Sequence, residues 1–354
     1  MSIFRDFFVK EKPVFTGIAR GVGGFGLGAG GPGSTPIQAS GGEIVLGTSQ
    51  TIDGVDYKYH YFKTPGTFLI PDAATFDANI DVLVISGGGS GGNRSGGGGG
   101  AGGIAVAEDL PFGASTGPLS IPITVGDGGP INNPGGHGEG NDGDDSRFGG
   151  PGDSWNVYAE GGGGGGGGTA PGIGRAGGSG GGGHYQYSGV AGTQPNHNPG
   201  KSAWVTNYGT AGSTGAGPPN HQSGAGGGAG SAALAASQPA RGAAGDGVQL
   251  PDWNVTYYMP NTDPWWPGIS PLPGTHFGGG GGGGDYPPYQ PQRMPGDATN
   301  GGGGIGGPAS GAGHGSPGIN GLGGAGGGAS GITVGPDGGY GGSGMVVIRY
   351  LGSV

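Results

Sequence analysis

The chain has 354 residues, of which 104 are glycine and 30 are proline, and it contains no cysteine. Without cysteine there can be neither disulfide bonds nor thiolate metal sites. The formal net charge of -10 provides no basic surface for a polyanion, so we expect no nucleic acid partner. Only 10% of the residues are charged, fewer than solvated disordered chains usually carry, so we expect the glycines to be packed.

Residues 1–42 begin as an aromatic and charged peptide and continue as a glycine-rich neck. The first 15 residues, MSIFRDFFVKEKPVF, contain no unbroken apolar run. They are therefore expected to be neither a signal peptide nor a membrane anchor, so that the protein is made in the cytoplasm and does not insert into a membrane. A short aromatic head on a flexible neck is typical of a docking peptide; the alternative is a terminus folded onto its own domain. The candidate docking residues are Phe4, Phe7, Phe8 and Phe15.

Residues 43–129 have the composition of β-strands separated by turns. The stretch 80–86, IDVLVIS, is apolar on both faces, as expected of a central buried strand. In the stretch 119–125 apolar residues alternate, and Pro122 indicates an edge position. The last apolar segment, residues 344–351, is expected to pair with 80–86 or a neighbour. Further strands are expected at 43–46, 57–62, 66–70 and 103–107.

The predicted fold is therefore all-β, a small β-sandwich closed by its N-terminal and C-terminal strands. No segment has a convincing amphipathic helical period, so no substantial α-helix is expected. We divide the chain into the docking peptide and neck (1–42), the sandwich strands (43–129), a glycine-rich body with irregular loops (130–343) and the closing strand (344–354).

Glycine runs in the body recur with a period of three residues, for example LGGAGGG from residue 322. A polyproline II-type helix has three residues per turn, and glycine at two of every three positions lets neighbouring helices approach. Ordering a residue costs about 1–2 kcal/mol, and one hydrogen bond returns about 0.5–1.5 kcal/mol, so such helices are stable only in a bundle. We expect a packed bundle of polyglycine II helices, with two of them at 161–168 and 176–183. Collagen is excluded because the glycines come in runs and not singly at every third position.

Motifs that suggest chemistry are weak in so glycine-rich a chain. Gly21, Gly23 and Gly26 match a dinucleotide-binding spacing, but no strand and helix flank them. The acidic stretch 138–146 could hold Ca²⁺, although a solvated turn is the simpler interpretation and the sequence does not decide between them. No nucleophile, base and acid are spaced for catalysis. We therefore predict no enzyme activity, no cofactor and no metal site.

Aromatic inserts between the glycine runs are the candidates for recognition, because aromatic side chains on rigid loops bring a large contact area at low entropic cost. The alternative is that the rings fold over the glycine bundle as a cap. The candidate receptor contacts are Trp155, Tyr158, Tyr185, Tyr187, Trp204, Tyr208, Trp253, Tyr257, Tyr258, Trp265 and Trp266.

Motifs at both ends of the glycine-rich body resemble those of a known family. Residues 62–68 read FKTPGTF, residues 81–92 read DVLVISGGGSGG, and residues 338–350 read GGYGGSGMVVIRY. In this order, over about residues 42–354, they resemble the glycine-rich domain of bacteriophage tail-fibre and virion proteins. The opening residues 1–26 also look like the N-terminus shared by virion structural proteins of T4-like cyanophages.

The resemblance implies a structural subunit of a phage virion appendage, similar to tail-fibre adhesins that pack polyglycine II helices and display variable loops. Such a subunit would dock through its N-terminal peptide and present aromatic loops to a host surface glycan or protein. Its expected location is the virion, and its expected partners are other virion proteins and further copies of itself in a homo-oligomer. The alternative is a purely structural or decorating protein of a virion or extracellular fibre, without a receptor. This chain differs from the adhesins in its longer inserts, above all residues 250–277.

Overall fold

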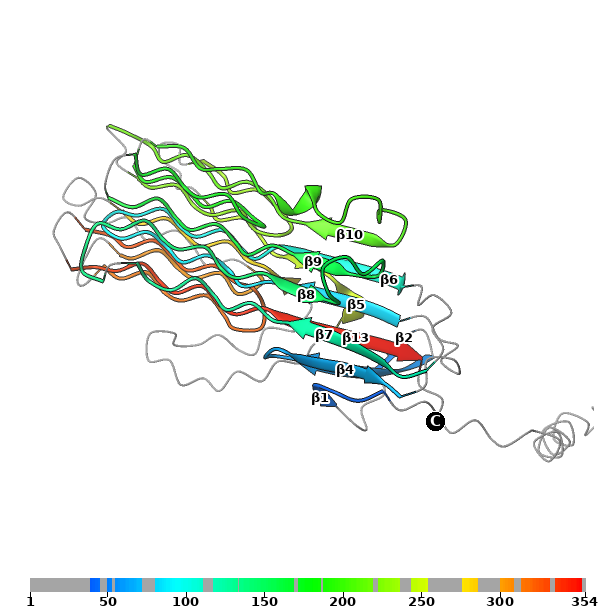
Figure 1. The fold of residues 1–354 in the computed structure, drawn as a ribbon. Coiled ribbons are helices and arrows are strands. Elements are labelled where there is room, and N and C mark those ends of the chain that lie inside the picture. Colours follow the sequence, from blue (N-terminus) through cyan, green and yellow to red (C-terminus); the bar gives the residue numbers. More distant parts are fainter. Residues whose placement is uncertain are drawn as a thin grey trace, which may run out of the picture. The chain divides into compact units, whose positions relative to one another are not determined.

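Strands and glycine-rich runs follow one another along the chain in the computed structural model (Figure 1). Residues 39–352 form one unit. The residues described are 39–44, 50–52, 55–71, 80–110, 117–132, 134–168, 171–185, 187–218, 222–235, 243–253, 276–285, 300–308, 313–331 and 335–351. The predicted docking residues Phe4, Phe7, Phe8 and Phe15 lie outside these ranges.

The larger of the sheets is antiparallel and has seven strands. Its order is β1-β3-β13-β5-β6-β10, and β2 pairs with β3 off this path. The bounds are β1 Glu43–Ile44, β2 Gln50–Ile52, β3 Val55–Phe62, β5 Ile80–Ile85, β6 Ile104–Leu110, β10 Val205–Tyr208 and β13 Met345–Leu351. Strand β13 lies between β3 and β5, so the predicted pairing of the last apolar segment with 80–86 is confirmed.

A four-stranded antiparallel sheet, in the order β4-β7-β8-β9, packs against the larger sheet. Its strands are β4 Gly66–Ile70, β7 Leu119–Thr124, β8 Ser146–Phe148 and β9 Val157–Ala159. Phe68 of β4 contacts the rings of His60 and Tyr350 from the larger sheet, at centroid distances of 5.1 and 6.5 Å. Fully buried residues such as Ile121 and Phe148 continue this core between the sheets.

A two-stranded sheet lies at the base of the long insert 250–277. Its strands are β11 (Val248–Gln249) and β12 (His276–Phe277). The remaining elements are the short 3-10 helices η1 (Gln194–Asn196) and η2 (Pro251–Trp253). No α-helix occurs in the ranges that the structure describes, and the prediction of an all-β fold is confirmed. Strands β8 to β12 lie inside the stretch 130–343 that the sequence presents as a glycine-rich body.

Pro122 does not mark an edge strand, because β7 pairs with β4 on one side and β8 on the other. The pairing with β8 covers only Ile123 and Thr124. Pro122 lies at the point where β8 ends, and its carbonyl accepts the N–H of Gly149 at 2.9 Å. The N–H that proline lacks would have pointed beyond the end of β8, so an interior position is tolerated.

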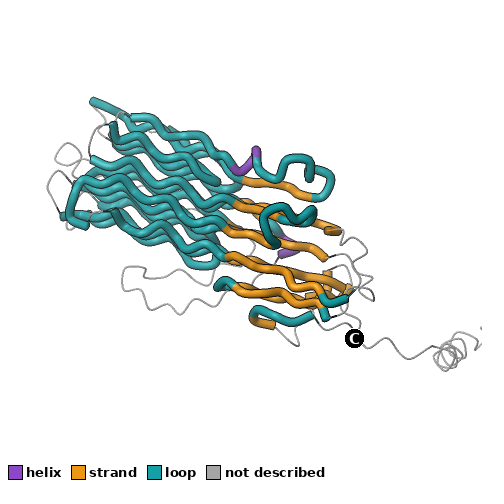
Figure 2. Tube along the Cα trace, viewed as in Figure 1, coloured by secondary structure: helices purple, strands orange, loops and turns teal. Residues whose placement is uncertain are grey.

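Glycine-rich runs continue the strands and lie side by side as long, nearly parallel segments (Figure 2). In the run 87–93, every third N–H group donates to the same neighbour. The N–H groups of residues 87, 90 and 93 donate to run 138–144, those of 88 and 91 to run 339–342, and those of 89 and 92 to run 97–100. Carbonyls of the same run accept from Gly129, from run 162–168 and from run 326–329. The run therefore has hydrogen-bonded neighbours on six sides.

A hydrogen-bond period of three residues is the period that a polyglycine II helix would give, because that helix has three residues per turn. No glycine between residues 161 and 168 has a φ in the left-handed region, so φ keeps the same sign along this run. The hydrogen bonds establish the period and the neighbours. The polyglycine II conformation remains our interpretation of them.

Glycine is required in these runs because backbones pack directly against each other. A Cβ on Gly91 would lie 2.0 Å from the carbonyl oxygen of Gly327, far inside van der Waals contact. Serine occurs where its hydroxyl can take part in the backbone hydrogen bonds. Buried Ser90 donates to the carbonyl of Pro130 and accepts from the N–H of Asn141, both at 2.8 Å.

The stretch 161–183 contains three runs, and the expectation of a single helix over 176–183 is wrong. Donors in 172–178 bond to run 161–168 in opposite order (175 to 164, 178 to 161), so these two runs are antiparallel. Donors in 161–168 bond to 179–183 in the same order (163 to 179, 166 to 182), so these two are parallel. The chain reverses at a bend at residues 178–179. The sequence around the bend, AGGSGGGG, has no large side chain that would mark it.

Candidate functional site

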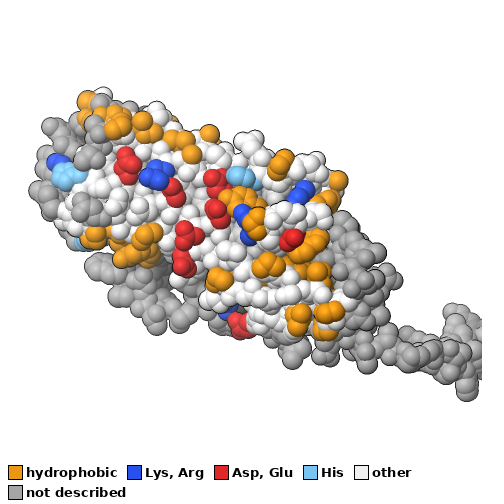
Figure 3. Space-filling model, in the orientation of Figure 1, with side chains coloured by type: hydrophobic (Ala, Val, Ile, Leu, Met, Phe, Trp, Pro, Cys, Tyr) orange, Lys and Arg blue, Asp and Glu red, His pale blue; other side chains and the backbone are white. Residues whose placement is uncertain are grey.

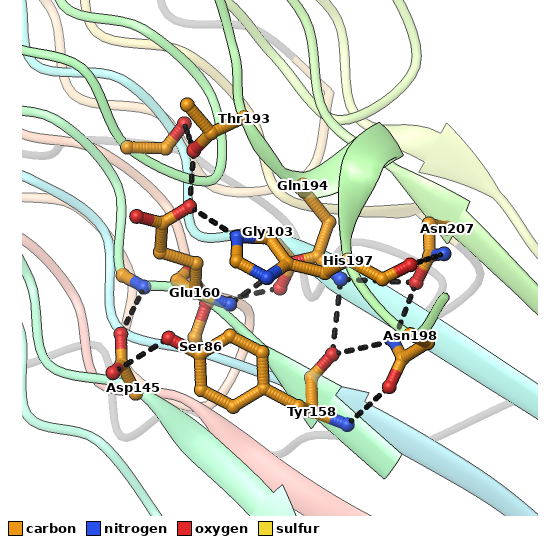
Figure 4. Close-up of polar contacts among 12 residues, drawn as sticks. Ser86, Gly103, Asp145, Tyr158, Glu160, Thr193, Gln194, His197, Asn198 and Asn207 are labelled. Carbon is orange, nitrogen blue, oxygen red and sulfur yellow. Dashed lines mark hydrogen bonds and ion pairs between the residues drawn. The ribbon is translucent and has the colours of Figure 1, made fainter. Parts of the chain in front are cut away.

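A group of polar side chains lies where strand β9 passes into the run 161–168 (Figure 4). The carboxylate of Glu160 accepts a hydrogen bond from the Thr193 hydroxyl, and its Oε2 lies 2.8 Å from Nε2 of His197. The side chains of Glu160 and His197 are 30% and 31% exposed. Glu160 thus orients both a hydroxyl and an imidazole, but the hydroxyl bonds to the carboxylate and not to the imidazole. This arrangement does not activate a nucleophile in the way a serine–histidine pair does.

Three amide side chains in the same group join the edge strands of the two sheets. Gln194 and Asn198 each donate to the carbonyl of Tyr158 in β9 and to Oδ1 of Asn207 in β10, at 2.8 to 3.0 Å. Asn198 Oδ1 accepts the N–H of Tyr158 at 3.0 Å. The amides therefore act as a substitute strand between β9 and β10. Their hydrogen bonds are used within the chain, which makes this part of the group structural.

Tyr158, a candidate receptor contact, has both its hydroxyl and its ring engaged within the chain. The hydroxyl donates to Oδ2 of Asp145 at 2.7 Å. The guanidinium of Arg147 lies 4.8 Å from the ring centroid, and the ring of His197 meets it edge-on at 4.9 Å. Burial, together with the hydrogen bond and charge of Asp145, raises the pKa of the Tyr158 phenol. Tyr158 behaves as part of a cap on the fold.

Carboxylates from the acidic stretch 138–146 bond to the outer N–H groups of the neighbouring run. Oδ1 of Asp142 and Oδ1 of Asp145 accept from the N–H groups of Gly164 and Gly161, each at 2.9 Å. Their spacing of three residues matches the hydrogen-bond period of the runs. Asp142 also binds Arg175 through two 2.7 Å hydrogen bonds. On the face drawn in Figure 3, charged side chains are scattered over a surface of backbone and uncharged side chains, with several hydrophobic patches.

The described residues contain no group of three His, Asp or Glu side chains that could hold a metal ion. In the same ranges, no helix has the length and the apolar character needed to cross a membrane.

Other aromatic candidates at the strands are half-buried against the fold. Trp155, between β8 and β9, meets the ring of Phe148 edge-on at 5.9 Å. Trp204 directly precedes β10, and Nζ of Lys201 lies 5.6 Å from the centroid of its ring. Tyr208 is in β10 itself, and burial raises the pKa of its phenol. These side chains therefore line the strands and do not gather around one cavity.

Tyr185 and Tyr187 lie in a turn that follows the run 179–183, at the end of the runs remote from the strands. The ring of Tyr187 stacks on His184 with a centroid distance of 6.2 Å. His184 is largely buried, and desolvation together with the charge of Arg94 lowers its pKa to about 4. Both tyrosines are partly exposed, which makes this turn a separate aromatic surface.

Trp253 is only 2% exposed and lies in the core, so it does not present its ring to solvent as a receptor contact would. The guanidinium of Arg349 in β13 lies 4.3 Å from the Trp253 ring centroid. Burial opposes the positive charge of Arg349, but the hydrogen bond and charge of Asp81 outweigh it and raise the Arg349 pKa. Asp81 and Arg349 belong to the otherwise apolar strands at 80–86 and 344–351. An acidic and a basic residue in two strands that are expected to pair are a sequence signal that could have identified the Asp81–Arg349 ion pair.

Four candidates lie outside the described residues: Tyr257, Tyr258, Trp265 and Trp266.

The fold and this geometry define an all-β protein in which hydrogen-bonded glycine runs extend from two packed sheets, with polar and aromatic side chains covering the margins. A family model for the glycine-rich domain matches residues 63–351. The match covers more than half of the chain, and the protein belongs to this glycine-rich domain family. Among curated proteins, none matches the chain significantly.

Proposed function

We propose that this protein is a structural subunit of a phage virion appendage, a tail fibre or its tip, that docks through residues 1–42 and presents aromatic loops to the host surface. The observation that carries the structural role is the six-sided hydrogen bonding of the run 87–93. A body in which backbone bonds to backbone on every side is stiff and leaves little room for a catalytic cleft. The phage assignment is supported by the sequence resemblance at residues 1–26, 62–68, 81–92 and 338–350.

The recognition part of the proposal centres on two segments, the turn with Tyr185 and Tyr187 and the insert 250–277. Tyr158 and Trp253 are engaged within the fold, which leaves these two segments as the better candidates. The insert carries four further aromatic candidates between its two paired stem strands, β11 and β12. A host surface glycan suits such a segment, because aromatic rings stack on sugar faces; a host protein is the other possible receptor.

Docking is tested by deleting residues 1–15 from the protein during virion assembly. The proposal expects the shortened protein to be absent from purified virions while it still accumulates as soluble protein in the infected cell. Retention of the shortened protein in virions, measured by immunoblotting against residues 39–352, would refute docking through this peptide.

Recognition is tested by exchanging residues 254–275 for a Gly-Ser linker of equal length and measuring adsorption of the virions to host cells. A control exchanges the shorter turn 132–137, which carries no Phe, Trp or Tyr. A loss of adsorption confined to the insert variant supports the adhesin role. Unchanged adsorption, together with normal incorporation, favours the alternative of a structural or decorating protein without a receptor.

A further inference from the structure

Arg349 is a buried cation that contacts two aromatic rings and a carboxylate. It is 6% exposed, its Nε donates to Oδ2 of Asp81 at 2.8 Å, and its guanidinium lies 5.0 Å from the ring centroid of Tyr57. Its guanidinium also lies 4.3 Å from the Trp253 ring centroid. Its Nη1 also donates to the carbonyl of Asp252 at 2.7 Å. Two of these four contacts are therefore made to the insert 250–277.

Strand register explains why this contact forms on the face of the larger sheet opposite the smaller sheet. Arg349 pairs directly with Asp81 across β13 and β5, so their side chains meet on one face. Met345 and Val347, four and two residues earlier in β13, belong to the same cluster as Trp253. Arg349, the only basic residue of the segment 344–351, thus contacts the first residues of the insert, Asp252 and Trp253.

The stem of the insert also packs in this cluster. Strands β11 and β12 pair as Val248 with Phe277 and Gln249 with His276. Leu250, Trp253 and Phe277 are all buried among residues of β3, β5, β6 and β13. The stem has only two pairs of residues, too few to be stable without the sheet beneath it. Its position must therefore come from side chains such as Trp253 that bind it to the sheet.

We propose that Arg349 is the positioning residue of the insert: it clamps Trp253 and the Asp252 carbonyl and so fixes the stem of residues 250–277 on the sheet for recognition. This rests on the proposed function in that the insert is taken as a recognition segment. A planar guanidinium suits the task because it can contact two rings while its N–H groups bond to a carboxylate and a carbonyl. A lysine retains the charge but cannot make these contacts together.

The test is hydrogen exchange of the full-length variant Arg349→Lys, followed separately for peptides from the stem (248–253 and 276–277) and from the smaller sheet (66–70 and 119–124). We expect stem amides to exchange roughly tenfold faster, as for loss of one desolvated cation–π contact, and the smaller sheet to be unchanged. Arg147→Lys is the matched control, because Arg147 lies over the Tyr158 ring away from the insert. Trp253→Leu removes the same contact from the insert side, so the effect of the double variant should be smaller than the two single effects combined.

Faster exchange confined to the stem, together with weaker adsorption of virions carrying Arg349→Lys, supports the proposal. An unchanged exchange rate in the stem, or an equal rise of the exchange rate in the stem and in the smaller sheet, would overturn the clamp. If the stem alone exchanges faster and adsorption is unchanged, the clamp stands and the recognition role of the insert is refuted. Should Arg349→Lys fail to fold, the Trp253→Leu variant answers the same question.

Discussion

Replacing one interior glycine by alanine tests whether direct backbone packing holds the runs together. In the Gly91→Ala variant the new Cβ would lie 2.0 Å from the carbonyl oxygen and 2.4 Å from the carbonyl carbon of Gly327. Contact without overlap needs about 3.5 Å, so the two runs would have to separate by more than about 1 Å. The clash involves backbone on both sides, so no side chain can rotate away to relieve it.

The free-energy cost follows from the hydrogen bonds that this separation would break. Gly326 donates to Gly89 and Ala329 donates to Gly92, both at 2.9 Å, across the same two runs. A shift of about 1 Å takes both beyond hydrogen-bonding distance. Each of the two buried N–H groups left without an acceptor costs about 1–3 kcal/mol, so we expect a loss of at least roughly 2–6 kcal/mol. That is a large part of the 5–15 kcal/mol typical of a whole domain.

Denaturant unfolding followed by tryptophan fluorescence measures this loss. The control is Gly152→Ala, at a φ of +96° with no atom within 4 Å of the added Cβ. It carries only the conformational cost of a positive φ, about 1–2 kcal/mol. If Gly91→Ala destabilises the protein no more than Gly152→Ala does, the runs are not packed backbone to backbone and the reasoning fails.

Three further predictions concern polar side chains. Since the folded pKa of His184 is about 4, below its ordinary 6.5, the unfolded chain takes up the proton first, and stability should fall as pH drops from 6.5 to 4. The effect is worth about 3 kcal/mol over that interval and should be missing in His184→Gln; equal pH slopes for the two proteins would contradict it. Asp142→Ala should cost about 1 kcal/mol in chemical denaturation, and Asp142→Asn less, because an amide oxygen can still accept the N–H of Gly164; equal losses would exclude this acceptor role. Ser90→Ala should cost about 1–3 kcal/mol, since it leaves the N–H of Asn141 without its acceptor, and a neutral result would contradict that bond.

The sequence was sufficient to predict the strands that are long enough to show a hydrophobic pattern. Residues 80–86 are apolar on both faces, and residues 344–351 form the second such segment, so their pairing could be predicted across more than 250 intervening residues. Strands β8, β9 and β11 are only two or three residues long, too short for any period to be visible. Tertiary contacts alone define them.

Other features could not be predicted from the sequence, because they depend on contacts with residues far away along the chain. The reversal at residues 178–179 lies within glycines that look the same on both sides. Trp253 has the surroundings of an exposed loop residue, with prolines and polar residues nearby. It is nevertheless buried in an apolar cluster with residues of β3, β5, β6 and β13, beside Arg349, all of them far away in sequence. Aromatic composition alone therefore could not predict whether a ring would face inward or outward.

Because every third N–H of the run 87–93 donates to the same neighbouring run, the position of a residue within the period of three determines its hydrogen-bond partner. Removing one residue would turn the rest of the run by a third of a turn, and each N–H after the deletion would point to the wrong neighbour. Removing three residues returns every later donor to the same neighbouring run, one turn away from its original acceptor, and only shortens the run. Insertions and deletions that survive within the runs should therefore come in multiples of three, whereas the turns between runs are free to change length by any number.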